Sequence, residues 1–320
     1  MTIANNTLVA LDHAAGLDIS NTDNFDDIIK QSGFDFEVEK VPVHDPEGEE
    51  IVNRRLLRRA DNHKMLGIVS DRYVSVDTKT MLEPFHELVT LHGATYESAG
   101  VIGGGKKCWI SATLPSGFSV SGREEDVIQQ RIVALINHDG LGKNAYFSLA
   151  NRIVCNNQLR LLMDHTNASD YGVTHTKNWE TRFEQASAGF KLAMDSMIHF
   201  EKTTKQLSSM PMKESQIDVF GRMLYKIDKK TSLSPQAVKR TNRLKELFKK
   251  GHGNHGETRW DALNAVTEML DHRVEGANKS PTAIRQARQN RFFRNNLSGY
   301  GDMLKQRAVR LLINSENTFK

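Results

Sequence analysis

The stretch from Gly100 to Lys107 sets three consecutive glycines before two lysines, a composition that can bind phosphate. Gly100-x-x-x-x-Gly105-Lys106 matches most of a loop in which backbone amides and a lysine hold nucleotide phosphates. That loop needs a helix after the glycines and a Ser or Thr beside the lysine. Here Lys107 takes that position, and residues 108–114 alternate in character as a strand does. We therefore predict a β-hairpin turning through Gly103–Gly105.

Cationic and aromatic side chains around this hairpin could contact a nucleic acid. Lys106 and Lys107 would lie at the hairpin tip and meet phosphates, and Trp109 on the next strand could stack on a base. A place in the core is the alternative for Trp109. The region that follows adds candidates of the same types, which are Lys143, Tyr146, Phe147 and Arg152. Together these residues would form a cationic groove that follows a phosphate chain.

Arginines in predicted strands need partners for their charge. Arg152 stands between apolar residues, so it requires either a carboxylate of the same chain or a phosphate of a ligand. The internal carboxylate is favoured, and the phosphate stays open. A second cluster, made of Arg54, Arg55, Arg58 and Arg59, is expected to pair with the acidic N-terminal segment.

The segment "RQARQNRFFRNN" has an arginine at every third position, and these are Arg285, Arg288, Arg291 and Arg294. At this spacing the four arginines form a cationic ridge on a helix, with Phe292 and Phe293 interleaved. It is the strongest polyanion-binding element in the sequence. An exposed basic helix without a ligand is equally compatible with the pattern.

Two histidine-containing segments could bind a metal ion. His138 could act as a general base with Asp139 on the metal, but Asp139-Gly140 is a turn pair and no second carboxylate lies close in sequence. His252 and His255 lie in a glycine-rich loop, which preorganises ligands poorly. We therefore assign no metal, no cofactor and no catalytic residue from the sequence.

The net charge of +4 is unevenly distributed along the 320 residues. Residues 1–50 carry −10, residues 51–170 carry +2 and residues 171–320 carry +12. This polarity suggests a polyanion-binding surface or head-to-tail contacts between subunits.

No apolar run is long enough to span a membrane, the N-terminus lacks a basic secretory region, and the two cysteines are far apart. We expect a cytoplasmic protein without membrane contact.

The pattern of elements predicts an α+β fold with three units. Residues 1–50 are expected to form an acidic N-terminal arm, extended from Asp18 to Glu50 with an edge strand near Phe34–Val43. Residues 51–170 should form a core of antiparallel β-hairpins with helices, and residues 171–320 an all-helical basic unit.

Within these units the local patterns predict individual elements. We expect a second strand at Tyr73–Val76, a helix in residues 78–93, a helix in residues 124–140 and a helix from about Gln158 onward. Ser234-Pro235 and Thr258 are expected to begin two later helices as N-caps.

Several motifs in this order resemble one protein family. They are "LGIVSDRYVSVD" from Leu66, the glycine hairpin with Trp109, "HDG" at 138–140, "NRIVCNNQL" from Asn151 and "RWDALNAVTEMLDHR" from Arg259. They are similar to the phage and plasmid family known as domain of unknown function 932, over residues 66 to 312. The resemblance implies a virus or mobile element and a cytosolic site of action, and it transfers no catalytic residue.

The sequence thus favours a phage-encoded, non-enzymatic and oligomeric protein that binds single-stranded nucleic acid, DNA rather than RNA, during replication or recombination. Its role would be analogous to that of strand-annealing proteins. Two alternatives stay open. One is a protein-interaction module or phage effector that engages a host protein through the acidic arm, and the other is a metal-dependent nuclease using His138 and Asp139.

Overall fold

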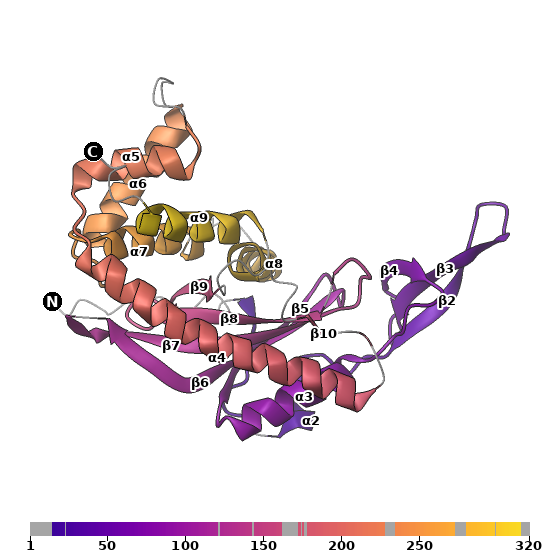
Figure 1. Cartoon of the computed structure of the whole chain (residues 1–320). Coiled ribbons are helices and arrows are strands. Elements are labelled where there is room, and N and C mark those ends of the chain that lie inside the picture. Colours follow the sequence, from indigo (N-terminus) through magenta and orange to yellow (C-terminus); the bar gives the residue numbers. More distant parts are fainter. Residues whose placement is uncertain are drawn as a thin grey trace.

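The computed structural model describes residues 15–22, 24–120, 122–142, 144–161, 172–173, 175, 178–227, 234–272, 280–297 and 299–314. Its strands form two antiparallel sheets, and helices lie on both faces of the larger one (Figure 1). The predicted α+β class is therefore confirmed. No helix in the described part of the chain is long and apolar enough to cross a membrane.

The larger sheet has the order β1-β5-β6-β7-β8-β10, with β9 pairing β8. The glycine hairpin predicted from the sequence is confirmed, because β5 and β6 pair from Thr95↔Thr113 to Ile102↔Lys107. Gly103, Gly104 and Gly105 all have positive φ, at 64°, 73° and 116°, which explains why glycines stand in this turn. The strands are β1 Leu17–Asp18, β5 Thr95–Ile102, β6 Lys107–Val120, β7 Arg123–Asn137, β8 Asn144–Arg152, β9 Asn157–Leu161 and β10 Gly172–Val173.

A smaller sheet projects from the side of the molecule (Figure 1). It consists of β2 Val38–His44, β3 Glu50–Arg59 and β4 Met65–Ser70, with β3 in the centre. The edge strand predicted near Phe34–Val43 is confirmed as β2. The second strand predicted at Tyr73–Val76 is wrong, since these residues form no ladder. A side chain of β2 holds the start of this stretch instead, because Lys40 Nζ donates to Asp71 O at 2.6 Å and to Tyr73 O at 3.0 Å.

The helices begin where the sequence places caps. Ser234 accepts a hydrogen bond from Ala237 N before Pro235, and Thr258 forms a capping box with Asp261, as predicted. The helices are α2 Phe25–Gln31, α3 Thr78–Leu91, α4 Trp179–Ser209, α5 Glu214–Leu224, α6 Pro235–Lys250, α7 Arg259–Asp271, α8 Pro281–Phe292 and α9 Tyr300–Asn314, with a π-helix η2 at Phe293–Leu297.

The two faces of the larger sheet pack against different helices. Ile110 and Ile132 face one way and join Phe85 of α3 and Phe190 of α4 in the main core. Their neighbours Trp109 and Val133 face the other way, onto Phe292 and Leu297 of α8 and η2. A third cluster joins the far ends of β7–β9 to α5, α6, α7 and α9.

Two helices predicted in the middle of the chain are strands. Residues 123–137 form β7, and residues 157–161 form β9. The last eight residues of β7 are buried on both faces, so the strand has a continuous apolar run without the alternation that marks a half-buried strand. A run of that kind cannot be told from a buried helix by periodicity alone.

The N-terminal segment is not a free extended arm. Residues 25–31 form α2, and Ile28, Ile29, Phe34 and Phe36 belong to the main core. The boundary proposed after Glu50 falls at the first residue of β3, and the helices beyond residue 171 share clusters with the strands. The division into three units stays a prediction.

Trp109 offers a test of this packing. Its indole is buried against Phe292 at 4.5 Å between ring centroids, so Trp109→Ala should lower the free energy of unfolding by about 3–5 kcal/mol. The matched control Trp179→Ala removes the same side chain at an exposed helix start and should cost far less. Urea unfolding of both variants makes the comparison, and equal reductions would contradict the assignment of Trp109 to the core.

Candidate nucleic-acid interface

Arg152 is fully used inside the protein. Its Nε and Nη2 donate to the two carboxylate oxygens of Asp126, both at 2.6 Å. Nη2 also donates to Gly253 O at 2.7 Å, and Nη1 donates to His252 O and Asn254 Oδ1, both at 3.0 Å. The guanidinium group has five N–H donors, and these five bonds occupy all of them. The prediction that Arg152 pairs with a carboxylate of the same chain is therefore confirmed. The prediction that Arg152 contacts nucleic acid is wrong.

The two lysines of the glycine hairpin do not form an open cationic tip. Lys107 Nζ donates to Asn137 Oδ1 at 2.6 Å and pairs with Asp139 at 2.9 Å. The turn itself is covered by the smaller sheet, since Arg59 Nη1 reaches Gly104 O at 3.5 Å. A Cβ at Gly105 would lie 3.0 Å from the Phe36 ring. Lys106 is half-buried in this junction.

The aromatic candidates on the strands are in the core. Trp109 and Tyr146 are buried, and Tyr146 packs against Phe85 at 5.4 Å and Phe190 at 5.9 Å between ring centroids. Phe147 is buried as well. Neither Trp109 nor Tyr146 can stack on a base, so both predictions are corrected. Lys143 lies outside the described residues.

The predicted pairing of the β3 arginine cluster with the acidic N-terminal segment is confirmed for Arg55 and Arg58 only. Arg58 meets Glu39 of β2 at 2.8 Å, and Arg55 meets Glu50 at 2.8 Å. Arg59 pairs with Asp61 at 2.6 Å and lies over the Phe36 ring at 4.0 Å. Of these pairs only Arg58–Glu39 joins two strands, and Arg54 is the exposed arginine of this sheet.

The His138–Asp139 turn is closed to a substrate. His138 is 1% exposed, and its Nε2 lies 2.8 Å from Thr78 Oγ1. Asp139 is held by Lys107. Within the described residues, no three His, Cys, Asp or Glu side chains are placed to share a metal ion. The burial of His138 and the pairing of Asp139 remove the geometric basis for a nuclease at this turn.

The arginines of α8 and η2 contrast with those of the sheet. Residues 280–301 contain no Asp or Glu, and Arg285 and Arg294 are exposed. Among the described residues, Arg285, Arg288 and Arg294 have no acidic partner. Arg291 is half-buried on the same helix and has a contact within the fold. We call Arg285, Arg288, Arg291 and Arg294 the arginine ridge.

An exposed tyrosine lies next to the end of this ridge. Gly299 passes close over Arg294, because a Cβ at Gly299 would lie 3.0 Å from Arg294 Cα. Tyr300 follows and is 52% exposed. Burial raises the pKa of the neighbouring Tyr225 to about 12; Arg240 acts against this shift and Tyr300 adds to it. Tyr300 is not among the contacts predicted from the sequence, although an aromatic residue at a helix start soon after a run of arginines could have indicated it.

Buried polar contacts fix η2 and α9 on the sheet. Lys305 of α9 is completely buried, and its Nζ donates to Asp271 at 2.7 Å and to Asn296 Oδ1 and Gln158 O, both at 2.6 Å. Arg160 of β9 adds a bidentate pair with Asp302, at 3.1 and 2.6 Å. These bonds connect α7, η2 and α9 to β9, so the arginine ridge and Tyr300 stand on a rigid base.

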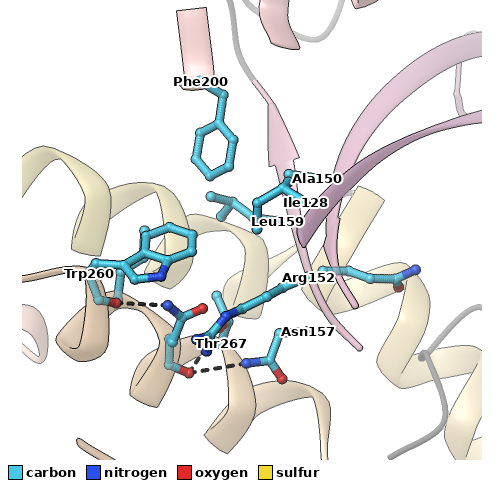
Figure 2. Close-up of a pocket in the computed structure, with 11 residues that line it drawn as sticks. Ile128, Ala150, Arg152, Asn157, Leu159, Phe200, Trp260 and Thr267 are labelled. Atoms are coloured by element: carbon cyan, nitrogen blue, oxygen red, sulfur yellow. Dashed lines mark hydrogen bonds between the residues drawn. The ribbon is translucent and has the colours of Figure 1, made fainter. Parts of the chain in front are cut away.

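A cavity between β7–β9 and α7 is too small for a ligand (Figure 2). Its volume of about 20 Å³ corresponds to one water molecule. Phe200 and Trp260 close it from the helices, and Ile128 and Leu159 close it from the strands. Asn264 Nδ2 donates to Trp260 O at 2.9 Å beside it, so the polar groups here serve packing between sheet and helices.

Comparison with known proteins agrees with the motifs noted in the sequence. The family model described as "Domain of unknown function (DUF932)" matches residues 65–297, which is well over half of the chain. The chain belongs to this family. The matched region runs from β4 to the end of η2 and so includes the larger part of the seven-stranded sheet and the arginine ridge. No curated protein and no solved structure matches the chain.

The buried His138 predicts a dependence of stability on pH. Burial, with a smaller contribution from His175, lowers the pKa of His138 to about 4 from an ordinary value of 6.5. The unfolded chain then binds this proton more tightly than the folded chain, so the stabilising contribution is complete above pH 6.5 and is lost as the pH falls toward 4. The loss amounts to about 3 kcal/mol.

His138→Gln removes this titration and should flatten the dependence of the unfolding free energy on pH between 6.5 and 4. Urea titrations across that interval measure it. His175 and His272, whose pKa values burial also lowers, stay in the variant and retain a slope of the same sign. An unchanged slope in the variant would show that His138 titrates normally.

Proposed function

We propose that the protein binds single-stranded nucleic acid through the arginine ridge and Tyr300. The observation that carries the proposal is that Arg285, Arg288 and Arg294 lie in a segment without acidic residues and have no acidic partner among the described residues. A guanidinium group without a carboxylate partner is available to phosphate oxygens, which it can bind through two parallel N–H···O bonds. The neighbouring cations of the sheet lack this availability, because Arg152 and Lys107 are paired internally.

The geometry favours a single strand over a duplex. Tyr300 is half-exposed at the start of α9, beside the ridge, and its ring can stack on a base only where that base is unpaired and accessible. Arg285, Arg288 and Arg294 would follow the backbone by charge alone, so the binding would tolerate many sequences. Such binding without catalysis is what a strand-annealing protein in replication or recombination requires.

This proposal replaces the groove expected on the strands with a site on α8, η2 and α9. Of the residues first expected to contact nucleic acid, Arg291 and Arg294 remain in the site, and Lys106 lies half-buried in the hairpin junction, on another element. A host-protein contact through a free acidic arm has less support, because Ile28, Ile29 and Phe34 of that segment belong to the core. Deleting residues 1–50 would therefore damage the fold and could not test such a contact.

The charge reversal Arg285→Glu/Arg294→Glu tests the proposal. Both side chains are exposed, so the fold should be retained, and repulsion of phosphates should weaken binding. The salt dependence should become shallower. The magnitude of the negative slope of log affinity against log salt should decrease by about 1 for each arginine that no longer binds a phosphate, or about 2 in total. Fluorescence anisotropy with a labelled oligonucleotide at several salt concentrations measures both quantities.

The control Lys202→Glu/Lys205→Glu makes the same change in net charge on α4, where both lysines are exposed. It should reduce affinity only slightly and leave the salt slope unchanged. Equal weakening in both double variants would mean that net charge alone drives binding, and unchanged affinity in the ridge variant would refute the proposed site.

A further inference from the structure

The hairpin of β2 and β3 ends in an acidic tip. Asp45 closes the turn by accepting hydrogen bonds from Glu47 N at 3.0 Å and Glu49 N at 2.9 Å. Glu50 pairs with Arg55. Glu47 and Glu49 are exposed, and among the described residues neither has a cationic partner. The tip therefore presents unneutralised carboxylates at the end of a projecting element.

The same sheet has an apolar face that no element of the described residues covers. Val41, Leu56 and Ile68 are register partners across β2, β3 and β4, and so they share the face opposite the buried Leu57. Ile68 is 54% exposed. Near the tip, Val52 is 75% exposed. Exposed apolar side chains that cluster beside charged ones are typical of a protein-contact surface.

This surface cannot reach the arginine ridge of its own molecule. Figure 1 shows the β2–β3 hairpin extending away from the body, with its tip far from α8. The strands of the larger sheet and the base of the smaller sheet lie between them. An acidic tip that met the ridge would have to come from another copy of the chain.

The region around the ridge offers a surface of matching character. Arg285 and Arg294 supply charge opposite to that of the tip, and Tyr300 and Met303 supply exposed apolar area, with Met303 59% exposed. We infer that the β2–β3 hairpin of one copy docks on the arginine ridge and the start of α9 of a second copy. Carboxylates of the tip meet guanidinium groups, and Val52 packs on Tyr300 and Met303.

The two halves of this contact are different surfaces of the same chain, so the assembly is head-to-tail. Each docked pair keeps one free tip and one free ridge, which allows a ring or an open filament. The contact does not require nucleic acid, but it uses the arginines of the proposed function. A nucleic acid bound on the ridge should therefore compete with the tip, and binding of the one should weaken binding of the other.

A charge exchange between the two surfaces tests the inference. Glu47→Arg/Glu49→Arg gives a basic tip facing a basic ridge, and Arg285→Glu/Arg294→Glu gives an acidic tip facing an acidic ridge. Each double variant alone should self-associate about tenfold or more weakly than the unaltered chain, since like charges oppose the contact. An equimolar mixture should associate again, because the basic tip of one variant meets the acidic ridge of the other, and the unaltered tip meets the unaltered ridge. Sedimentation velocity at low salt measures all three samples.

The control Glu124→Arg/Glu125→Arg makes the same charge change on β7, where both side chains are exposed, and should leave association unchanged. A monomeric unaltered chain, or a mixture that fails to associate, would overturn the inference. The tip variant keeps the ridge intact and removes its competitor, so it should bind oligonucleotide at least as tightly as the unaltered chain. Weakened association with retained binding supports the docking, whereas absence of oligonucleotide binding in the unaltered chain refutes only the proposed function.

Discussion

The buried ion pair between Arg152 and Asp126 is the constraint on which the rest of the structure depends. It joins β8 to β7, and the remaining donors of Arg152 hold the loop before α7, so one guanidinium group fixes the helical half of the chain on the sheet. Trp260 Nε1 donates to the same carboxylate at 3.2 Å. Removing one partner of such a pair leaves a buried charge without compensation and costs about 3–5 kcal/mol. The charge of Arg152 therefore serves the fold and is not available to a ligand.

Buried ion pairs recur between the strands and the helical half and also within the helical half. Arg123 pairs with Asp261 at 2.7 Å, and Lys305 meets Asp271 in a site without solvent access. Burial lowers the pKa of Lys305, while Asp271 opposes that shift. A positive net charge in this chain is consequently a poor measure of its binding surface, because several of its cations are buried and paired. Arg285, Arg288 and Arg294 differ from these, since they stand on α8 and η2 in a segment without carboxylates.

Features fixed by short sequence patterns could be predicted. The glycine turn of the β5–β6 hairpin and the caps at Ser234 and Thr258 follow from local chemistry. β7 could not be recognised as a strand, because burial on both faces removes its alternation. The partners of Arg152 could not be found either. Asp126 is 26 residues away and His252 is 100 residues away, and only the fold brings them together.

In the candidate site, helix α8 could be predicted from the sequence, but the position of Tyr300 beside it could not. The three-residue spacing of the arginines indicated the ridge, but the π-helix after it and the position of Tyr300 depend on Lys305, Asn296 and β9. Tertiary contacts thus decide which aromatic residue accompanies the cations. Trp109 and Tyr146, which are near the lysines in sequence, point into the core, whereas Tyr300 is exposed beside Arg294.

Photo-cross-linking with an oligonucleotide that carries a photoreactive base analogue tests most directly which residues contact nucleic acid. It distinguishes the arginine ridge with Tyr300 from the buried Trp109 and Tyr146. Digestion and mass spectrometry then locate the attached residue. The account predicts attachment at Tyr300 and in the peptides that contain α8 and η2. Attachment at Trp109 or Tyr146, with the ridge peptides unmodified, would contradict it.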